Sequence, residues 1–263
     1  MEETPQRLDT LMVERGLAET RSRAQGMILA GAVRVGDRIV TKAGSRISPD
    51  QALSVVQGNP FVSRAGGKLD AALDDFGIEV AGRSCLDAGA STGGFTDVLL
   101  KSGVERVLAV DVGYGQLDWS LRQDPRVAVL ERTNVRHLKG SDLPFGPDLL
   151  VADLSFISLG VALRTLLSTT PSLGEAVVLV KPQFEAGPDL VGRGGVVGDP
   201  GVRAEVILAV VRSFADLGFG AVDLAPAAVT GRKSGNQEYP LRLLRGATAT
   251  LNEGRIREVV AGA

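Results

Sequence analysis

Two charged side chains stand at the ends of strongly apolar segments of the sequence. Asp153 lies in LLVADLSF and Lys181 lies in VVLVKPQFE, each at the exit of a predicted strand. An unpaired charge buried in such a segment would be costly, so both side chains are expected to point into a crevice. A lysine that is near other cations or partly removed from water can accept a proton. The two residues therefore predict either proton-transfer chemistry or a structural Asp–Lys ion pair.

A glycine-rich loop, LDAGASTGGFT over residues 86–96, is the clearest sign of a bound ligand. Glycines after a strand let the backbone approach a ligand closely. The spacing D-x-G-x-x-x-G-G differs from the dinucleotide pattern G-x-G-x-x-G, which disfavours an NAD-dependent oxidoreductase. Asp111 ends the next predicted strand about 20 residues later, where a carboxylate binds ribose hydroxyls in doubly wound folds. A nucleoside-type cofactor is therefore favoured over an ordinary tight turn.

Strand-like and helix-like segments alternate from about Phe61 onward, which predicts a doubly wound, mostly parallel sheet. The carboxyl ends of such strands line one crevice. Two late strands, near Val222–Pro226 and Tyr239–Arg245, are expected to form a terminal antiparallel hairpin. The earlier strands are predicted at Ser84–Ala88, Arg106–Val112, Val127–Arg132, Leu149–Leu154 and Ala176–Val180, and the helices at Thr96–Lys101, Leu159–Ser168 and Val202–Leu217.

The first 59 residues predict a small α+β domain with two short helices and a hairpin at Gly36-Asp37. The net charge of the chain is only −2, yet residues 15–46 contain seven basic and two acidic residues. Basic charge is thus concentrated near the N-terminus, as expected for contact with nucleic acid. We expect a domain over residues 1–59, a linker over 60–63 and the larger α/β domain over 64–263.

Composition excludes several classes of protein. No apolar stretch approaches the roughly 20 residues needed to span a bilayer, and the N-terminus has no apolar signal-peptide core. A single cysteine, Cys85, and a single histidine, His137, argue against disulfides, metal clusters and a His-based triad. The sequence predicts a cytoplasmic protein with no metal and no membrane partner, in which Cys85 and Trp119 belong to the core.

Eight segments, in order along almost the whole chain, carry a resemblance to a known family. The sequence resembles the FtsJ-like RNA 2′-O-methyltransferases and, more closely, the TlyA family of S4-domain rRNA methyltransferases, often called hemolysin A. The segments are VSRAGGKL (62–69), CLDAGASTGGFT (85–96), DVGYGQL (111–117), ERTN (131–134), VADLSFISL (151–159), LVKPQFE (179–185), GGVV (194–197) and SGNQEY (234–239).

The resemblance implies a Rossmann-like class I methyltransferase fold that uses S-adenosyl-L-methionine. The family's Lys-Asp-Lys-Glu tetrad falls on Lys68, Asp153, Lys181 and Glu238. Lys181 is expected to orient and deprotonate a cytidine 2′-hydroxyl of ribosomal RNA, and Asp153 to hold that lysine. Lys68 and Glu238 would complete the network. The expected cofactor contacts are Asp87, Gly89, Thr92, Gly93, Gly94, Asp111, Asn134 and Phe156.

The N-terminal segment resembles the S4 RNA-binding fold. Its arginines are expected to contact phosphates of ribosomal RNA or of whole ribosomal subunits, although a solvated helical face would have the same composition. Two further readings stay open: an S4-type RNA-binding protein without catalysis, and a membrane-active hemolysin. The arginines expected to bind RNA are Arg7, Arg21, Arg23 and Arg34.

Overall fold

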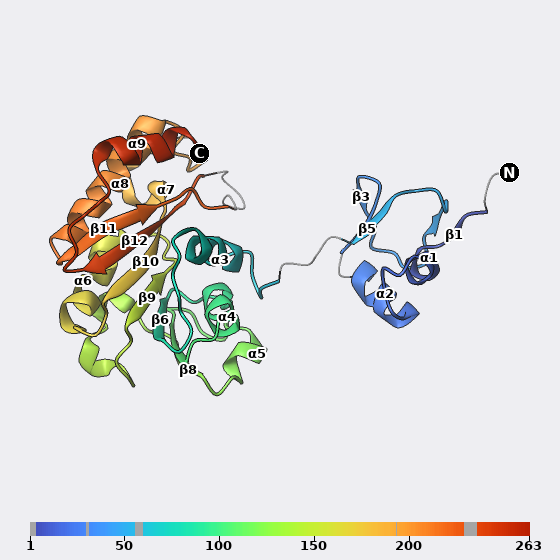
Figure 1. Cartoon of the computed structure of the whole chain (residues 1–263), viewed down its shortest axis with the longest axis horizontal. Helices are drawn as coiled ribbons and strands as arrows, with labels where there is room; N and C mark the ends of the chain where they lie inside the picture. The colour runs from blue at the N-terminus through green and yellow to red at the C-terminus, as the bar shows by residue number, and fades with distance from the viewer. Residues whose placement is uncertain (1–3, 30–31, 56–59, 193, 229–235) are drawn as a thin grey trace. The chain divides into compact units, whose positions relative to one another are not determined.

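The structure is a computed structural model that describes residues 4–29, 32–55, 60–192, 194–228 and 236–263. The chain divides into two compact units, residues 1–60 and 61–263 (Figure 1). The predicted boundary residue Asn59 lies outside the described residues, as do Ser234 and Gly235 of SGNQEY. Phe61, Val62 and Ser63, predicted to be part of a linker, belong to the second unit.

A seven-stranded sheet in the order β11-β12-β10-β9-β6-β7-β8 forms the centre of the second unit. Five neighbouring strands of this sheet are parallel to one another, in the order β10-β9-β6-β7-β8. Strand β12 is antiparallel to both β10 and β11. The predicted doubly wound sheet with a terminal hairpin is therefore confirmed. The strands are β6 (Ser84–Ala88), β7 (Arg106–Val110), β8 (Val127–Leu130), β9 (Leu149–Ala152), β10 (Glu175–Val180), β11 (Phe219–Leu224) and β12 (Tyr239–Arg245).

Helices cover both faces of this sheet (Figure 1). One face packs against α6, α8 and α9, and the other against α3 and α4, so an apolar core lies on each side of the strands. Among the described residues, no helix has both the length and the apolar character needed to cross a bilayer. The helices are α3 (Gly66–Asp75), α4 (Gly94–Lys101), α5 (Trp119–Arg122), α6 (Leu159–Thr169), α7 (Pro182–Glu185), α8 (Pro200–Ala215) and α9 (Glu253–Ala261), with short 3-10 turns at Val135–His137, Gly140–Asp142 and Pro188–Leu190.

Three strands end two residues before the predicted position. The strands were predicted to continue to Val112, Arg132 and Leu154, but they end at Val110, Leu130 and Ala152. Beyond those points the chain turns out of the sheet, and Arg132 adopts a left-handed φ of 52°. The prediction that Trp119 is a core residue was wrong, because its side chain is 72% exposed at the start of α5.

The first unit is a small α+β fold with its own core. Helices α1 and α2 pack on each other and on short strands through Leu8, Met12, Ile28 and Val33, all fully buried. This confirms the two predicted helices and the small β-element. The elements are β1 (Gln6–Arg7), α1 (Leu8–Glu14), α2 (Arg21–Leu29), β2 (Val33–Val35), β3 (Arg38–Ile39), β4 (Arg46–Ile47) and β5 (Leu53–Val55), paired as β1-β4 and β3-β2-β5.

Candidate active site

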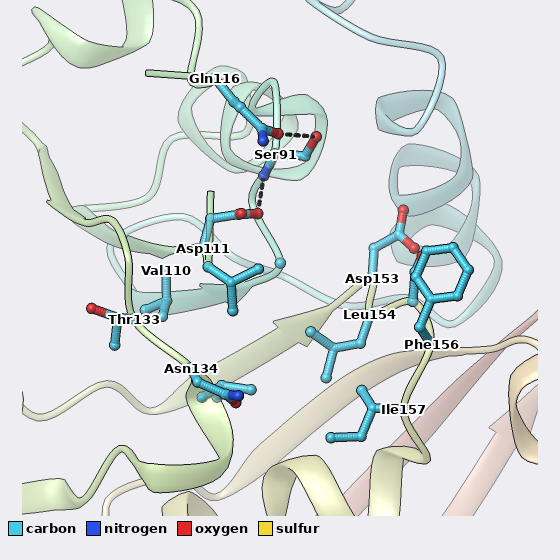
Figure 2. A pocket seen from close by; sticks show the side chains of 14 residues that line it. Ser91, Val110, Asp111, Gln116, Thr133, Asn134, Asp153, Leu154, Phe156 and Ile157 are labelled. Carbon is cyan, nitrogen blue, oxygen red and sulfur yellow. Dashed lines mark hydrogen bonds between the residues drawn. The ribbon is translucent and has the colours of Figure 1, made fainter. Parts of the chain in front are cut away.

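A cavity of about 550 Å³ opens at the carboxyl ends of β6, β7, β8 and β9, where the strand order reverses. This is where open α/β sheets bind ligands, and the volume is typical of small-molecule pockets, roughly 300–1,000 Å³. A smaller cavity of about 180 Å³ shares four of its lining residues. Figure 2 shows Asp111 across the larger cavity from Asp153 and Phe156. The shared residues are Gly89, Ser91, Asp153 and Ser155.

Gly89 brings the glycine-rich loop against the exit of β9. Its φ is +86°, and a Cβ at this position would lie 2.7 Å from the carbonyl oxygen of Asp153. Only glycine tolerates both the left-handed backbone and this close approach. The loop between β6 and α4 and the acidic end of β9 are therefore held together as two walls of the site.

Asp111 presents a fixed carboxylate to the larger cavity. The backbone N–H of Ser91 donates to Oδ2 at 2.8 Å, and the backbone N–H of Gly113 donates to Oδ1 at 2.6 Å. A carboxylate has about four lone-pair positions, so each oxygen retains capacity for a further donor. Ser91 also hydrogen-bonds Gln116, which lines the same cavity (Figure 2). This geometry suits recognition of a pair of hydroxyl groups.

Lys181 lies at the other end of the site, in the smaller cavity. Its Nζ forms an ion pair with Oδ1 of Asp153 at 2.5 Å and donates a hydrogen bond to the Ser155 hydroxyl at 3.0 Å. The ring of Phe184 lies below, 5.8 Å from Nζ to its centroid. A lysine ammonium has three donors, so one N–H remains for a group that enters the cavity. Lys181 is thus oriented by the chain from two sides.

The other two predicted tetrad residues form a second ion pair, between Lys68 on α3 and Glu238 before β12. Both side chains are largely buried. Strand pairing places Tyr239 opposite Val180, so the next residues along the two strands, Glu238 and Lys181, leave the sheet side by side. The structure therefore brings the four predicted residues together as two ion pairs at one end of the sheet.

Asp87 is fully buried at the end of β6 and lines neither cavity. The hydroxyl of Thr96 donates to its Oδ2 at 2.7 Å, while Oδ1 has no hydrogen-bond partner among the described residues. Burial raises the pKa of Asp87 to about 7, against the lowering effect of the Thr96 hydroxyl. This side chain can influence a ligand only through the loop and through its charge.

The other predicted cofactor residues divide between the two cavities. Phe156 adopts a left-handed φ of 64° and is 89% exposed, with its ring centroid 4.8 Å from that of Phe184. Gly93 also has a positive φ but lines neither cavity. Gly89, Asp111, Asn134 and Phe156 line the larger cavity, and Gly89, Thr92 and Gly94 line the smaller one.

Sequence reasoning missed several polar residues of the site. Ser155 accepts a hydrogen bond from Lys181, the Ser91 N–H donates to Asp111, and Gln116 accepts from the Ser91 hydroxyl. Ser155 could have been found, because it lies two residues after Asp153 at a strand exit. Gln116 belongs to a loop whose path the sequence does not predict. Among the described residues, no group of three or more His, Cys, Asp or Glu side chains could hold a metal ion.

The arginines predicted to bind RNA lie in the first unit and are not equivalent. Arg7 and Arg21 both form ion pairs with Asp9, which the sequence prediction did not include. Arg23 on α2 and Arg34 on β2 are exposed. The structure thus gathers two of the four predicted arginines around one carboxylate.

Comparison with known proteins matches both units. The model of the FtsJ-like methyltransferase family matches residues 61–243, and the S4 domain model matches residues 6–53. A relative from Mycobacterium tuberculosis, 16S/23S rRNA (cytidine-2′-O)-methyltransferase TlyA, is 51% identical over 90% of this chain and 89% of its own length. Hemolysin A of Brachyspira hyodysenteriae is 40% identical over 89% of this chain and 97% of its own length.

A solved structure agrees with these matches. A protein from Streptococcus thermophilus named as a hemolysin is 37% identical, has a TM-score of 0.75, and is aligned over 98% of this chain and 95% of its own length. The family motifs, the cavity at the strand exits and these relatives agree with one another. The chain therefore belongs to the FtsJ-like methyltransferases and, with its S4 domain, to the TlyA family.

Proposed function

We propose that this protein transfers a methyl group from S-adenosyl-L-methionine to the 2′-hydroxyl of a cytidine in ribosomal RNA. The observation that carries the proposal is the Asp153–Lys181 ion pair, with one lysine N–H left to face the smaller cavity. A ribose hydroxyl is a weak acid and a weak nucleophile, so a methyltransferase must aim it and remove its proton. An oriented lysine beside a nucleoside-sized cavity can do both.

The residues that line the cavities fit the proposed cofactor. Asp111 would accept hydrogen bonds from the two ribose hydroxyls, since both of its oxygens retain free lone pairs. Asn134 would lie along the nucleoside, and Gly89, Thr92 and Gly94 along the amino-acid portion near Lys181. When bound, S-adenosyl-L-methionine supplies an activated methyl group on a sulfonium centre.

Lys181 would hold the 2′-hydroxyl in line with that methyl group and accept its proton at Nζ. For that step Lys181 must be the neutral amine, so that its lone pair takes the proton while the ribose oxygen bonds to the methyl carbon. Asp153 would keep Nζ in place through the 2.5 Å contact and offset positive charge in the site. Lys68 and Glu238 would stabilise the same end of the sheet by their own ion pair. Alignment of the two reactants supplies much of the expected rate enhancement.

The substrate is inferred from the relatives and the first unit. The Mycobacterium tuberculosis relative is named for rRNA and for the cytidine 2′-oxygen, and the S4 match covers the basic N-terminal segment. We infer that residues 1–59 bind ribosomal RNA through Arg7, Arg21, Arg23 and Arg34, and that residues 64–263 carry out the transfer. Residues 60–63 would connect the two domains, with 61–63 packed as part of the second unit. Ribosomal subunits are then the partner, which implies a cytoplasmic location.

The proposal is tested by incubating purified protein with S-adenosyl-L-methionine labelled on the methyl group and with small or large ribosomal subunits from a strain that lacks the gene. Label in the RNA of one or both subunits is expected, and it identifies the substrate. Cofactor binding without label on either subunit would favour an RNA-binding protein without this activity. Absence of cofactor binding would exclude a methyltransferase, and leakage from liposomes would instead support the hemolysin reading.

A further inference from the structure

Asp9 is a fully buried carboxylate at the centre of a cationic cluster in the first unit. Arg7 donates to it from two nitrogens, Nε to Oδ1 at 3.0 Å and Nη2 to Oδ2 at 2.9 Å. Arg21 donates from Nε at 3.0 Å, and Gln25 donates from its side-chain amide at 2.8 Å. One side chain in α1 thus binds residues of β1 and α2. These donors, with Arg7 first, hold the pKa of Asp9 far below its usual range.

The cluster contains more positive charge than a structural ion pair requires. One carboxylate faces two guanidinium groups, so the group of three carries a net charge of +1. The side chains of Arg7 and Arg21 are 45% and 54% exposed, whereas that of Asp9 is 0% exposed. A single arginine would neutralise Asp9, and the second adds repulsion between like charges. The excess charge lies on the solvent side, where an anion can reach it.

The two guanidinium groups keep donors available for a ligand. Among the described residues, Nη1 of Arg7 and both terminal nitrogens of Arg21 have no partner. The loop at Gly44 confines Arg7 from another side, because a Cβ there would lie 3.1 Å from Nη1. Both planar groups are therefore held before any ligand arrives, which lowers the entropy lost on binding.

We propose that Asp9 is a positioning residue that fixes Arg7 and Arg21 as one binding site for a phosphodiester group of RNA. The inference rests on the proposed function, since it assigns RNA as the partner of the S4 unit. RNA is favoured over an acidic protein segment because the Mycobacterium tuberculosis relative is named for rRNA, and the S4 match over residues 6–53 covers both arginines. Two rigid, forked donors also match the geometry of a phosphate group.

The test compares Asp9→Asn with Asp37→Asn in the full-length protein, with labelled 16S and 23S rRNA as probes in a filter-binding assay. Asp37 is an exposed acid in the same unit, so both variants remove one negative charge. Bulk electrostatics alone predicts equal or tighter binding by both. Our proposal predicts that Asp9→Asn weakens binding about ten-fold, the size of one charge-assisted contact, while Asp37→Asn does not. Unchanged or tighter binding by Asp9→Asn would overturn the proposal.

A second comparison separates positioning from folding. Arg7→Gln with Arg21→Gln keeps amide donors near Asp9 but removes both charges, and Asp9→Asn is then added to that double variant. If Asp9 acts through the arginines, the addition has no further effect, and the double variant lowers the salt dependence of log K by about one phosphate contact. If Asp9→Asn weakens binding as much in this background as in the wild type, its role is general folding and the proposal is wrong.

These assays distinguish a failure of the proposed methyl transfer from a failure of the positioning role of Asp9. Wild-type protein that binds RNA through the Asp9 cluster but transfers no methyl group would contradict the proposed function alone. Methyl transfer that is insensitive to Asp9→Asn, together with unchanged RNA affinity, would contradict the positioning role alone. Wild-type protein that binds neither rRNA would contradict both.

Discussion

At the scale of single residues, Asp87 predicts a pH dependence of stability. Burial raises its pKa to about 7 in the folded protein, against about 3.9 in an unfolded chain. Between these values the folded state binds the extra proton, so the contribution of Asp87 to the free energy of unfolding falls as pH rises from about 4 to about 7. Asp87→Asn cannot titrate, yet its amide oxygen can accept the Thr96 hydrogen bond.

Urea unfolding of both proteins at several pH values checks this expectation. The free energy of unfolding of Asp87→Asn, minus that of the wild type, should increase from about pH 5 to about pH 8. All other titrating groups are shared, so the difference isolates Asp87. A difference that is flat or falls over this range would show that the carboxyl is already ionised in the folded protein at low pH.

Residue types at strand exits made part of the site predictable. Asp111, Asp153 and Lys181 each follow an apolar segment, and the structure places all three at the cavities. The partners of these residues were not predictable to the same degree, because Gln116 depends on how a loop folds back. Asp9 was missed for a similar reason: its burial depends on α1, α2 and β1 packing together.

At the scale of elements, the approach of the glycine-rich loop to β9 predicts a difference between two glycines. Gly89 and Gly103 have almost the same φ, +86° and +84°. A Cβ added at Gly89 would lie 2.7 Å from the carbonyl oxygen of Asp153, whereas a Cβ added at Gly103 would lie 3.7 Å from its nearest neighbour, Ala81. Both alanine variants should lose roughly 1–3 kcal/mol of stability through backbone strain. Only Gly89→Ala should also move the loop and weaken binding of S-adenosyl-L-methionine, by ten-fold or more.

Calorimetric titration of the cofactor into the two variants measures this difference. Gly103 lies before β7, at the end of the strands opposite the cavities. Gly103→Ala therefore introduces the same backbone strain without a close approach to the cofactor site. Equal cofactor affinity of the two variants would mean that the close approach at Gly89 does not shape the binding site.

The same elements show where sequence patterns stop being informative. The order and type of the strands follow from alternation of apolar segments with helices, and the sheet agrees. Strand ends were predicted too far along because Val112 and Leu154 are apolar, although Val112 is 68% exposed and both line the larger cavity. Residues at the rim of a cavity can be apolar without being in a strand, and hydrophobic periodicity does not distinguish the two cases.

At the scale of the whole molecule, separate cores predict separate unfolding. The core around Leu8 contains only residues of the first unit, whereas Leu86 belongs to the core of the second. Leu8→Ala should cost about 2–5 kcal/mol in the first unit and leave the melting of the second unchanged. Leu86→Ala should do the reverse. Differential scanning calorimetry checks this, and one shared transition lowered equally by both variants would contradict it.

The most direct test of the central claim is to locate the transferred methyl group. Ribosomal RNA labelled by the purified protein would be digested to nucleosides and analysed by mass spectrometry, with Lys181→Ala and Lys139→Ala beside the wild type. Lys181 lies in the site, whereas Lys139 is an exposed lysine that lines neither cavity. We expect 2′-O-methylcytidine from the wild type and Lys139→Ala, and a loss of about 10²–10⁴-fold in Lys181→Ala with cofactor binding retained. A methyl group on a base, or full activity of Lys181→Ala, would contradict the account.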